Sequence, residues 1–191
     1  PFYFRYEIGF DDDGAIRGLD LMLAANGGHV ADHTPAVLTR ALCHSDNCYW
    51  LPALRFRGLP CKTNTVSNTA FRGFGGPQGL VGGERMIEDI AYALGKDPLE
   101  IRKVNFYGGE DRNVTPYHQV VEDNIIERIV EELETSSDYA ERRKAALEFN
   151  KSSPVIKRGI ALTPVKFGIS FTATWYNQAG ALVHVYNDGS V

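Results

Sequence analysis

The sequence predicts an α+β fold in which antiparallel strand pairs flank a helical middle. Strand-like alternation of apolar side chains fills the first third of the 191 residues and returns near the other end, whereas helical spacing dominates between them. Strands and helices are therefore segregated along the chain, without the βαβα alternation of a parallel sheet. With 43% hydrophobic residues, the chain can bury a sizeable core as one domain or two small lobes.

The first elements are predicted to be a β-hairpin and a short helix. Apolar side chains alternate through residues 1–31 on both sides of an acidic turn that ends at Gly14. Thr34 is the expected N-cap of a helix that has Pro35 at its first position. This helix should turn four residues inward, namely Val37, Leu38, Ala41 and Leu42. A second strand pair is predicted over residues 54–64.

The middle of the chain is predicted to be helical. The longest helix should begin near Pro77 and end at Gly95, because the apolar residues between them recur at helical spacing. Asp97 and Pro98 should open a second, shorter helix that runs through Asn105.

The second half is predicted to begin with a polar loop at residues 107–119. An amphipathic helix should follow, with an apolar face formed by Ile125, Ile126, Ile129, Val130 and Leu133. A mostly charged helix is expected at about 138–149, and strands at 159–166 and 181–186. The chain would then divide into a strand-rich lobe with a short helix around Arg40 (1–66), a loop and helical segment (67–150), and strands that carry Phe171 (151–191).

Composition and charge argue against several classes of protein. A net charge of -4 and a pI near 5.7 give no reason to expect nucleic acid or an anionic membrane as a partner. No apolar run approaches the roughly 20 residues that span a bilayer, and the N-terminus lacks a signal-peptide pattern. The chain begins directly in a predicted strand and stops just after a turn that follows another, so we expect an internal fragment of a longer protein.

The cysteines and histidines show no metal-binding spacing. Cys43, Cys48 and Cys61 form no CxxC pair and are too few for an iron–sulfur cluster, which usually needs four thiolates. Scattered thiols of this kind favour small core residues in a reducing cytoplasm. His29 and His33 are four residues apart near a predicted turn, and we expect neither to be a ligand.

The stretch from Phe71 to Gly76 is the least ordinary part of the sequence. Its three glycines permit positive φ and close approach of the backbone to a ligand. A helix start directly after the loop lets its amides face an oxygen-rich anion. The spacing matches neither a Walker loop nor GxGxxG, so the residues alone leave a purely structural turn open.

Longer strings of residues resemble the molybdenum hydroxylase family of xanthine dehydrogenases and aldehyde oxidases. The segment SNTAFRGFGGPQ at 67–78 looks like the molybdopterin-contacting signature of that family. Five further stretches resemble the family in the same order: Arg40–Leu42 with Asp46–Tyr49, Cys61–Asn64, Lys166–Thr172, Asn177–Ala181 and Val185–Val191. The resemblance covers the whole chain and implies part of the molybdenum-cofactor-binding region of a xanthine dehydrogenase.

The resemblance implies roles for residues of the glycine-rich loop and for two aromatic rings. Phe71, Arg72 and Gly73 would offer backbone contacts to the molybdenum–molybdopterin cofactor. Phe74 and Phe171 would hold a planar purine, one by its face and one by its edge. From the residues alone, ordinary core packing would be the expected role of both phenylalanines.

The resemblance also implies a catalytic, substrate-binding arginine. Arg40 would face the purine carbonyl and stabilise the negative charge that hydroxylation places on the heterocycle. The spacing alone would make Arg40 a solvated surface residue of a helix. Thr172 would hydrogen-bond the substrate, and Trp175 would line the entrance. No protein metal ligand is expected, because pterin dithiolene sulfurs hold the molybdenum in this family.

The implied activity is hydroxylation of hypoxanthine and xanthine to uric acid, with water as the oxygen source. Electrons would pass to [2Fe-2S], FAD and NAD on other domains or subunits of a cytoplasmic homodimer. The family's general-base glutamate has no counterpart in these residues, so the chain alone should be inactive. The alternatives are an aldehyde oxidase or another N-heterocycle hydroxylase of the family, which the arginine at position 40 disfavours, and a non-catalytic docking module.

Overall fold

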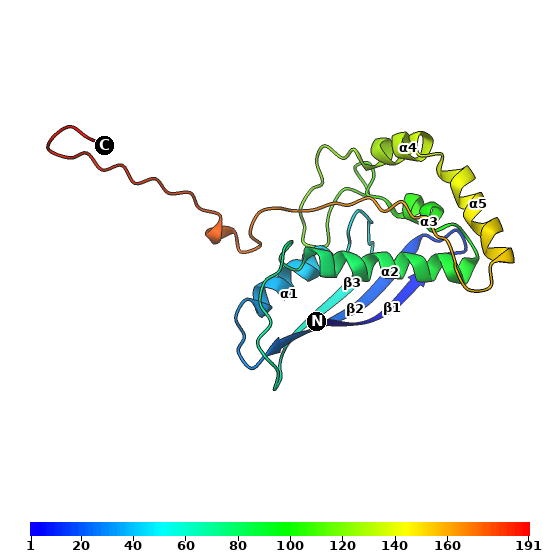
Figure 1. Cartoon of the computed structure of the whole chain (residues 1–191), viewed down its shortest axis with the longest axis horizontal. Helices are drawn as coiled ribbons and strands as arrows, with labels where there is room; N and C mark the ends of the chain where they lie inside the picture. Colours follow the sequence, from blue (N-terminus) through cyan, green and yellow to red (C-terminus); the bar gives the residue numbers. More distant parts are fainter.

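The computed structural model describes all 191 residues, which form one three-stranded sheet with α1 and α2 packed on it (Figure 1). The strands are β1 (Phe2–Phe10), β2 (Ile16–Gly28) and β3 (Leu54–Lys62), in the order β1-β2-β3. The helices are α1 (Thr34–Cys43), α2 (Gly76–Leu94), α3 (Pro98–Asn105), α4 (Ile126–Ser136) and α5 (Tyr139–Ser152), with a short 3-10 helix η1 (Thr174–Tyr176). The predicted α+β class and the helical middle are confirmed.

The sheet combines one antiparallel and one parallel pair. β1 and β2 form the predicted hairpin, in which Tyr6 lies opposite Leu21. β3 is a single strand that runs parallel to β2, with Phe56 opposite Leu21. The prediction of an antiparallel strand pair at 54–64 is therefore wrong. A parallel neighbour needs a long crossover connection, and the segment that contains α1 supplies it between β2 and β3.

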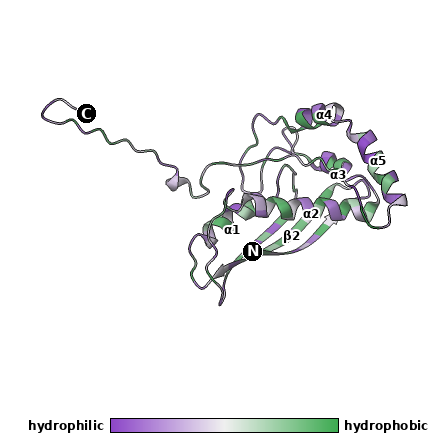
Figure 2. Cartoon of the chain, in the orientation of Figure 1, coloured by the Kyte–Doolittle hydropathy of each residue, from purple (hydrophilic) through white to green (hydrophobic).

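The core lies between the sheet and α2. Leu21 and Leu23 of β2 are completely buried, and Ile87 and Ile90 of α2 pack in the same cluster. Figure 2 shows hydrophobic and hydrophilic residues interspersed along β2 and α2, as expected for elements buried on one side. The cluster extends to Leu162, so all three predicted segments contribute to one core.

The N-terminal half of α2 lies unusually close to the backbone of α1. Three glycines four residues apart face α1, namely Gly75, Gly79 and Gly83. A Cβ atom at Gly83 would lie 2.6 Å from the carbonyl oxygen of Ser45. Cβ atoms at Gly75 and Gly79 would collide with the carbonyl oxygens of Val37 and Ala41. Only glycine permits this approach of the helices.

The helix ends mostly follow the predictions. Gly95 ends α2 in the left-handed conformation, and the Asp97 side chain accepts a hydrogen bond from the Leu99 amide at the start of α3. The prediction of Thr34 as N-cap is wrong, because Thr34 is already the first residue of α1. Its buried side chain lies against Gly27 of β2 and so does not reach the helix amides.

The predicted strands at 159–166 and 181–186 are absent. Residues 151–191 contain only η1 as regular structure beyond the end of α5, so Phe171 lies on no strand. A strand is stable when its backbone pairs with a neighbour, and neither segment lies beside the sheet. Residues 177–191 extend away from the body of the molecule (Figure 1). None of the helices is long and apolar enough to cross a membrane.

Replacement of Gly79 by alanine should destabilise the protein. We expect Gly79→Ala to lower the free energy of unfolding by about 1–3 kcal/mol, because the new methyl group overpacks against the Ala41 carbonyl. Gly9→Ala is the control, since a Cβ there meets nothing within 4 Å. Urea unfolding of both variants measures the difference. A Gly79→Ala protein as stable as the control would contradict the close packing of α1 and α2.

Candidate cofactor and substrate site

The glycine-rich loop before α2 has a strained backbone. Gly73, Phe74 and Gly75 adopt φ values of 90°, 52° and 103°, all in the left-handed region. Phe74 is the informative member, because a bulky residue with positive φ costs free energy that the surrounding structure must repay. The Phe74 amide donates to the Phe71 carbonyl at 2.8 Å, and the Gly76 amide donates to the Gly73 carbonyl at 3.0 Å. These two bonds hold the turn.

Several amides of this loop have no acceptor within the chain. The backbone N–H groups of Phe71, Arg72, Gly73 and Gly75 donate to no protein group. The loop is accessible, since 78% of Phe71 is exposed and Arg72 is also exposed. It leads directly into the N-terminus of the 19-residue helix α2, where the helix dipole is positive. The arrangement is suited to binding an oxygen-rich anion.

A segment of the C-terminal part runs back over the helices beside this loop. We call residues 164–171 the C-terminal strip (Figure 1). The Asn47 side-chain amide donates to the Pro164 carbonyl at 3.0 Å and accepts from the Lys166 amide at 3.1 Å. The Lys166 ammonium lies 3.0 Å from the Asp46 carboxylate. Side chains that follow α1 in the sequence thus bind a segment whose backbone is not paired with any strand.

Arg40 binds the same strip from the last turn of α1. Only 4% of Arg40 is exposed, so the surface interpretation is wrong. Its Nη1 donates to the Gly168 carbonyl at 2.5 Å, and its Nη2 donates to the Ser170 carbonyl. The guanidinium lies 5.8 Å from the ring centres of both Phe74 and Phe167, within cation–π range. Its Nε is buried without a partner.

The two predicted substrate-binding rings lie together. The centroids of Phe74 and Phe171 are 5.5 Å apart, with their planes tilted by 52°. Phe171 also meets Tyr176 edge to face at 5.1 Å, and Phe74 meets His33 in the same way at 5.8 Å. The fold therefore brings Arg40, Phe74 and Phe171 into one cluster, although they are far apart in the sequence.

Thr172 and Trp175 lie at the edge of this cluster. Thr172 is half-buried and lines a hollow of about 800 Å³, whose wall continues through Trp175 and Tyr176 to the start of α1. It also lines a second hollow of about 390 Å³, which Cys43 and His118 share. Trp175 is 68% exposed. Both hollows adjoin Phe171, so a ligand at the aromatic pair would have access from solvent.

A buried polar network underlies the strip, and the sequence patterns did not reveal it. Glu84 of α2 accepts from Asn47 at 2.7 Å, from Tyr49 at 2.6 Å and from two nitrogens of Arg102 at 2.8 and 2.9 Å. Arg102 is 1% exposed and also pairs with Glu88. Burial raises the pKa of the Tyr49 hydroxyl. Glu84 therefore orients Asn47 and is not available as a general base.

Asp46 forms the second buried contact of the strip. It is 1% exposed and accepts a hydrogen bond from the Tyr107 hydroxyl at 2.6 Å. Burial raises the pKa of the Asp46 carboxyl, while the Lys166 ammonium and the Tyr107 hydroxyl oppose that shift. No sequence signal revealed this site, because polar residues such as Ser45, Asp46 and Asn47 after a helix are normally exposed, and here all three are buried.

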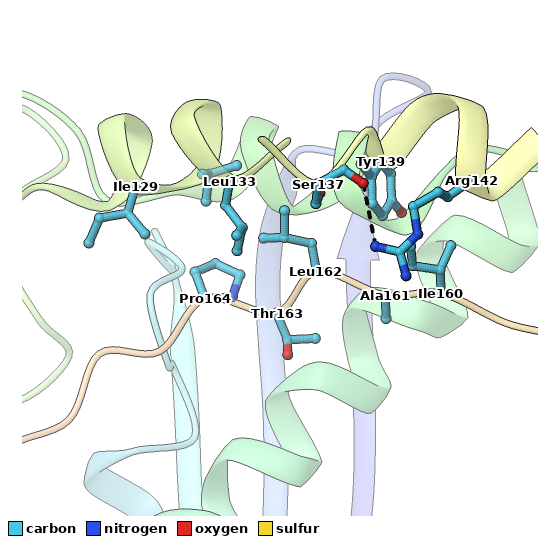
Figure 3. A pocket seen from close by; sticks show the side chains of 11 residues that line it. Ile129, Leu133, Ser137, Tyr139, Arg142, Ile160, Ala161, Leu162, Thr163 and Pro164 are labelled. Atoms are coloured by element: carbon cyan, nitrogen blue, oxygen red, sulfur yellow. Dashed lines mark hydrogen bonds between the residues drawn. The ribbon is translucent and has the colours of Figure 1, made fainter. Parts of the chain in front are cut away.

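A separate apolar hollow of about 400 Å³ lies between α4, the start of α5 and residues 160–164 (Figure 3). Its lining is mainly aliphatic, including Ile129, Leu133 and Leu162, and Arg142 points to the Ser137 carbonyl at 3.4 Å. It shares no residue with the Arg40 cluster and contains no carboxylate or thiol. The chain also has no group of three or more His, Cys, Asp or Glu residues placed to hold a metal ion.

Comparison with known families identifies the class of protein. A model described as a molybdopterin cofactor-binding domain matches residues 1–106, and a second model of the same description matches residues 132–191. The chain belongs to the molybdopterin cofactor-binding domain family. The molybdopterin prediction is confirmed at this level.

Several curated proteins similar to this chain are xanthine dehydrogenases. The chain is 47% identical over its full length to xanthine dehydrogenase of Dictyostelium discoideum, and equally to xanthine dehydrogenase/oxidase of Gallus gallus. It spans 14% of the length of each. The resemblance drawn from the sequence motifs is thereby confirmed.

Solved structures agree on the fold. Aldehyde oxidoreductase from Desulfovibrio gigas superposes with a TM-score of 0.68 at 26% identity, over 81% of this chain and 16% of the other. Quinoline 2-oxidoreductase from Pseudomonas putida 86 has a TM-score of 0.65 at 22% identity, over 78% of this chain and 20% of the other. The latter likeness bears on the fold alone.

Removal of Arg102 should destabilise the protein strongly. We expect Arg102→Met to lower the free energy of unfolding by about 3–5 kcal/mol, because Glu84 would keep a largely buried charge without its partner. The matched control is Arg128→Met, whose ion pair with Glu132 is exposed and should contribute about 0–1 kcal/mol. Urea unfolding compares them. Equal effects of the two substitutions would contradict a structural role for the Glu84 network.

Proposed function

We propose that this chain is part of the molybdenum-cofactor subunit of a xanthine dehydrogenase, which hydroxylates hypoxanthine and xanthine to uric acid with water as the oxygen source. The observation that carries the proposal is the cluster of Arg40, Phe74 and Phe171 beside a loop of free amides. The 47% identity to xanthine dehydrogenases over the full chain supports it.

The glycine-rich loop would hold the molybdenum–molybdopterin cofactor. Phe71, Arg72 and Gly73 have amides without acceptors, and these fit the oxygen-rich parts of such a group. When bound, the cofactor would accept the electrons released by hydroxylation. The close packing of α1 and α2 would fix these amides relative to the residues that bind the substrate.

The aromatic pair and Arg40 would bind and orient the purine. Phe74 and Phe171 would each contribute about 0.5–1.5 kcal/mol beyond burial by ring contacts. The tilt of 52° between their planes would let one ring meet a planar purine by its face and the other by its edge. Arg40 would stabilise the negative charge that develops on the heterocycle. Thr172 would donate a hydrogen bond to the substrate, and Trp175 would line the entrance.

The remaining parts of the proposal concern the complete enzyme. [2Fe-2S], FAD and NAD would lie on other domains or subunits and receive the electrons, in a cytoplasmic homodimer that acts in purine metabolism. The alternative is an aldehyde oxidase or another N-heterocycle hydroxylase of the same family. The likeness to an aldehyde oxidoreductase structure favours that alternative, whereas the buried cation at position 40 favours a purine carbonyl.

Substitution of Arg40 distinguishes these substrates. In the full-length enzyme, Arg40→Met should lower kcat/KM for xanthine by roughly a hundredfold or more, because one transition-state donor is lost. The measurement compares xanthine with an aromatic aldehyde. Arg85→Met, an exposed arginine paired with Asp89, serves as control. Preference for the aldehyde in the wild type, with no effect of Arg40→Met, would contradict the purine assignment.

A further inference from the structure

His44 links the last turn of α1 to the middle of the C-terminal strip. Its Nδ1 lies 2.9 Å from the Arg40 carbonyl, and its Nε2 lies 3.0 Å from the Gly168 amide. The ring also packs against Phe167 with centroids 4.7 Å apart. His44 is 5% exposed, and its contact with Arg40 is buried whereas its contact with Gly168 is partly buried.

The two partners fix the protonation state of the ring. A carbonyl oxygen can only accept, so Nδ1 must carry a proton that it donates to Arg40. The Gly168 amide can only donate, so Nε2 must be unprotonated. His44 is therefore held as the neutral Nδ1-protonated tautomer. A second proton on Nε2 would face the Gly168 N–H and break that bond.

The position of Gly168 matters for the substrate-binding cluster. Its carbonyl accepts from Arg40, and Phe171 follows three residues later against Phe74. Gly168 is thus held on both sides, through its N–H by His44 at the C-cap of α1 and through its C=O by Arg40 of α1. No strand pairing substitutes for these contacts.

We infer that His44 is a positioning residue of the proposed site, which in its neutral form holds the C-terminal strip so that Arg40 and Phe171 keep their places. The inference rests on the proposed function for its effect on substrate, but the holding of the strip follows from the contacts alone. Protonation of His44 would release the strip and open the aromatic pair.

The groups that face His44 determine how it responds to pH. Arg40 lies one turn before His44. Cys43 and Asp46 are its neighbours in the sequence, one residue before it and two residues after it. Lys166 faces it from the strip, and the loop after α3 contributes Tyr117 and His118 to the adjoining hollow. Burial lowers the pKa of His44 below its ordinary value of 6.5, and the Lys166 and Arg40 charges act in the same direction. The hydrogen bond to the Arg40 carbonyl and the Asp46 charge oppose this shift.

The sign of the pH effect follows from this direction. A histidine with a lowered pKa in the folded state stabilises the strip fully above the unfolded value of about 6.5. That contribution is lost as the pH falls below this value and through the lower pKa of the folded state. Acid should therefore loosen the strip, and neutral to alkaline pH should hold it.

Hydrogen exchange in the full-length protein tests the inference without any substrate. His44→Leu should increase exchange of the amides at 166–170 by at least about tenfold, because the bond to Gly168 is lost. His44→Gln keeps a neutral acceptor and should restore much of the protection at pH 7.5. In the wild type, protection corrected for intrinsic rates should fall below about pH 6.5. In His44→Gln this fall should be clearly smaller, because only the Asp46 contact with Lys166 still responds to acid. His184→Leu, on an exposed histidine, is the control.

Steady-state kinetics of the same variants test whether His44 affects substrate binding. KM for xanthine should rise about tenfold in His44→Leu, equivalent to one lost buried hydrogen bond, with a smaller change in kcat.

Unchanged exchange at 166–170 in His44→Leu would overturn the inference, whatever the substrate is. Increased exchange with an unchanged KM would overturn the positioning role. If the wild type does not oxidise xanthine, the proposed function fails, and the exchange experiment still decides whether His44 holds the strip. If His44→Leu does not fold, the pH dependence of the wild type against His44→Gln gives the same decision.

Discussion

The contact between α1 and α2 is the interaction on which the rest of the structure depends. Gly75, Gly79 and Gly83 repeat every four residues and lie directly on the carbonyl oxygens of Val37, Ala41 and Ser45, which repeat in the same way. This alignment of glycines with carbonyl oxygens extends over about two helical turns. No side chain separates the two backbones there, so the start of α2 and the loop before it are fixed beside the last turn of α1. Any cofactor bound by that loop would lie next to Arg40 for the same reason.

The C-terminal strip depends on α1 in a different way. It reaches the site as a backbone segment without strand pairing, and the polar side chains of Arg40, His44 and Asn47 supply the hydrogen bonds that a neighbouring strand would otherwise give. Glu84 and Arg102 in turn hold Asn47. The position of Phe171 is therefore set by side-chain chemistry, which can respond to pH and to a ligand more readily than a sheet can.

Short-range sequence preferences correctly predicted the turns and helix ends that depend on one or two neighbouring residues. The turn at Gly14, the end of α2 at Gly95 and the capping of α3 by Asp97 all follow from residues that favour one backbone geometry. The parallel pairing of β3 could not be predicted, because alternation indicates a strand and not its neighbour. Residues 159–166 and 181–186 also alternate like strands, but nothing in the fold pairs with them. Motif resemblance selected Arg40, Phe74 and Phe171, and their roles remain predictions. The other residues that hold the strip, His44, Asp46 and Asn47, were given no role from the sequence, since buried polar residues are recognisable only once their partners are in place.

A crystal structure of the full-length protein with its cofactor and xanthine bound would test the central claim most directly. The account predicts a purine in contact with the rings of Phe74 and Phe171, with Arg40 within hydrogen-bond distance of a purine carbonyl and the amides of Phe71 to Gly73 facing the cofactor. A purine bound away from this cluster, or a cofactor that leaves these amides facing solvent, would contradict it.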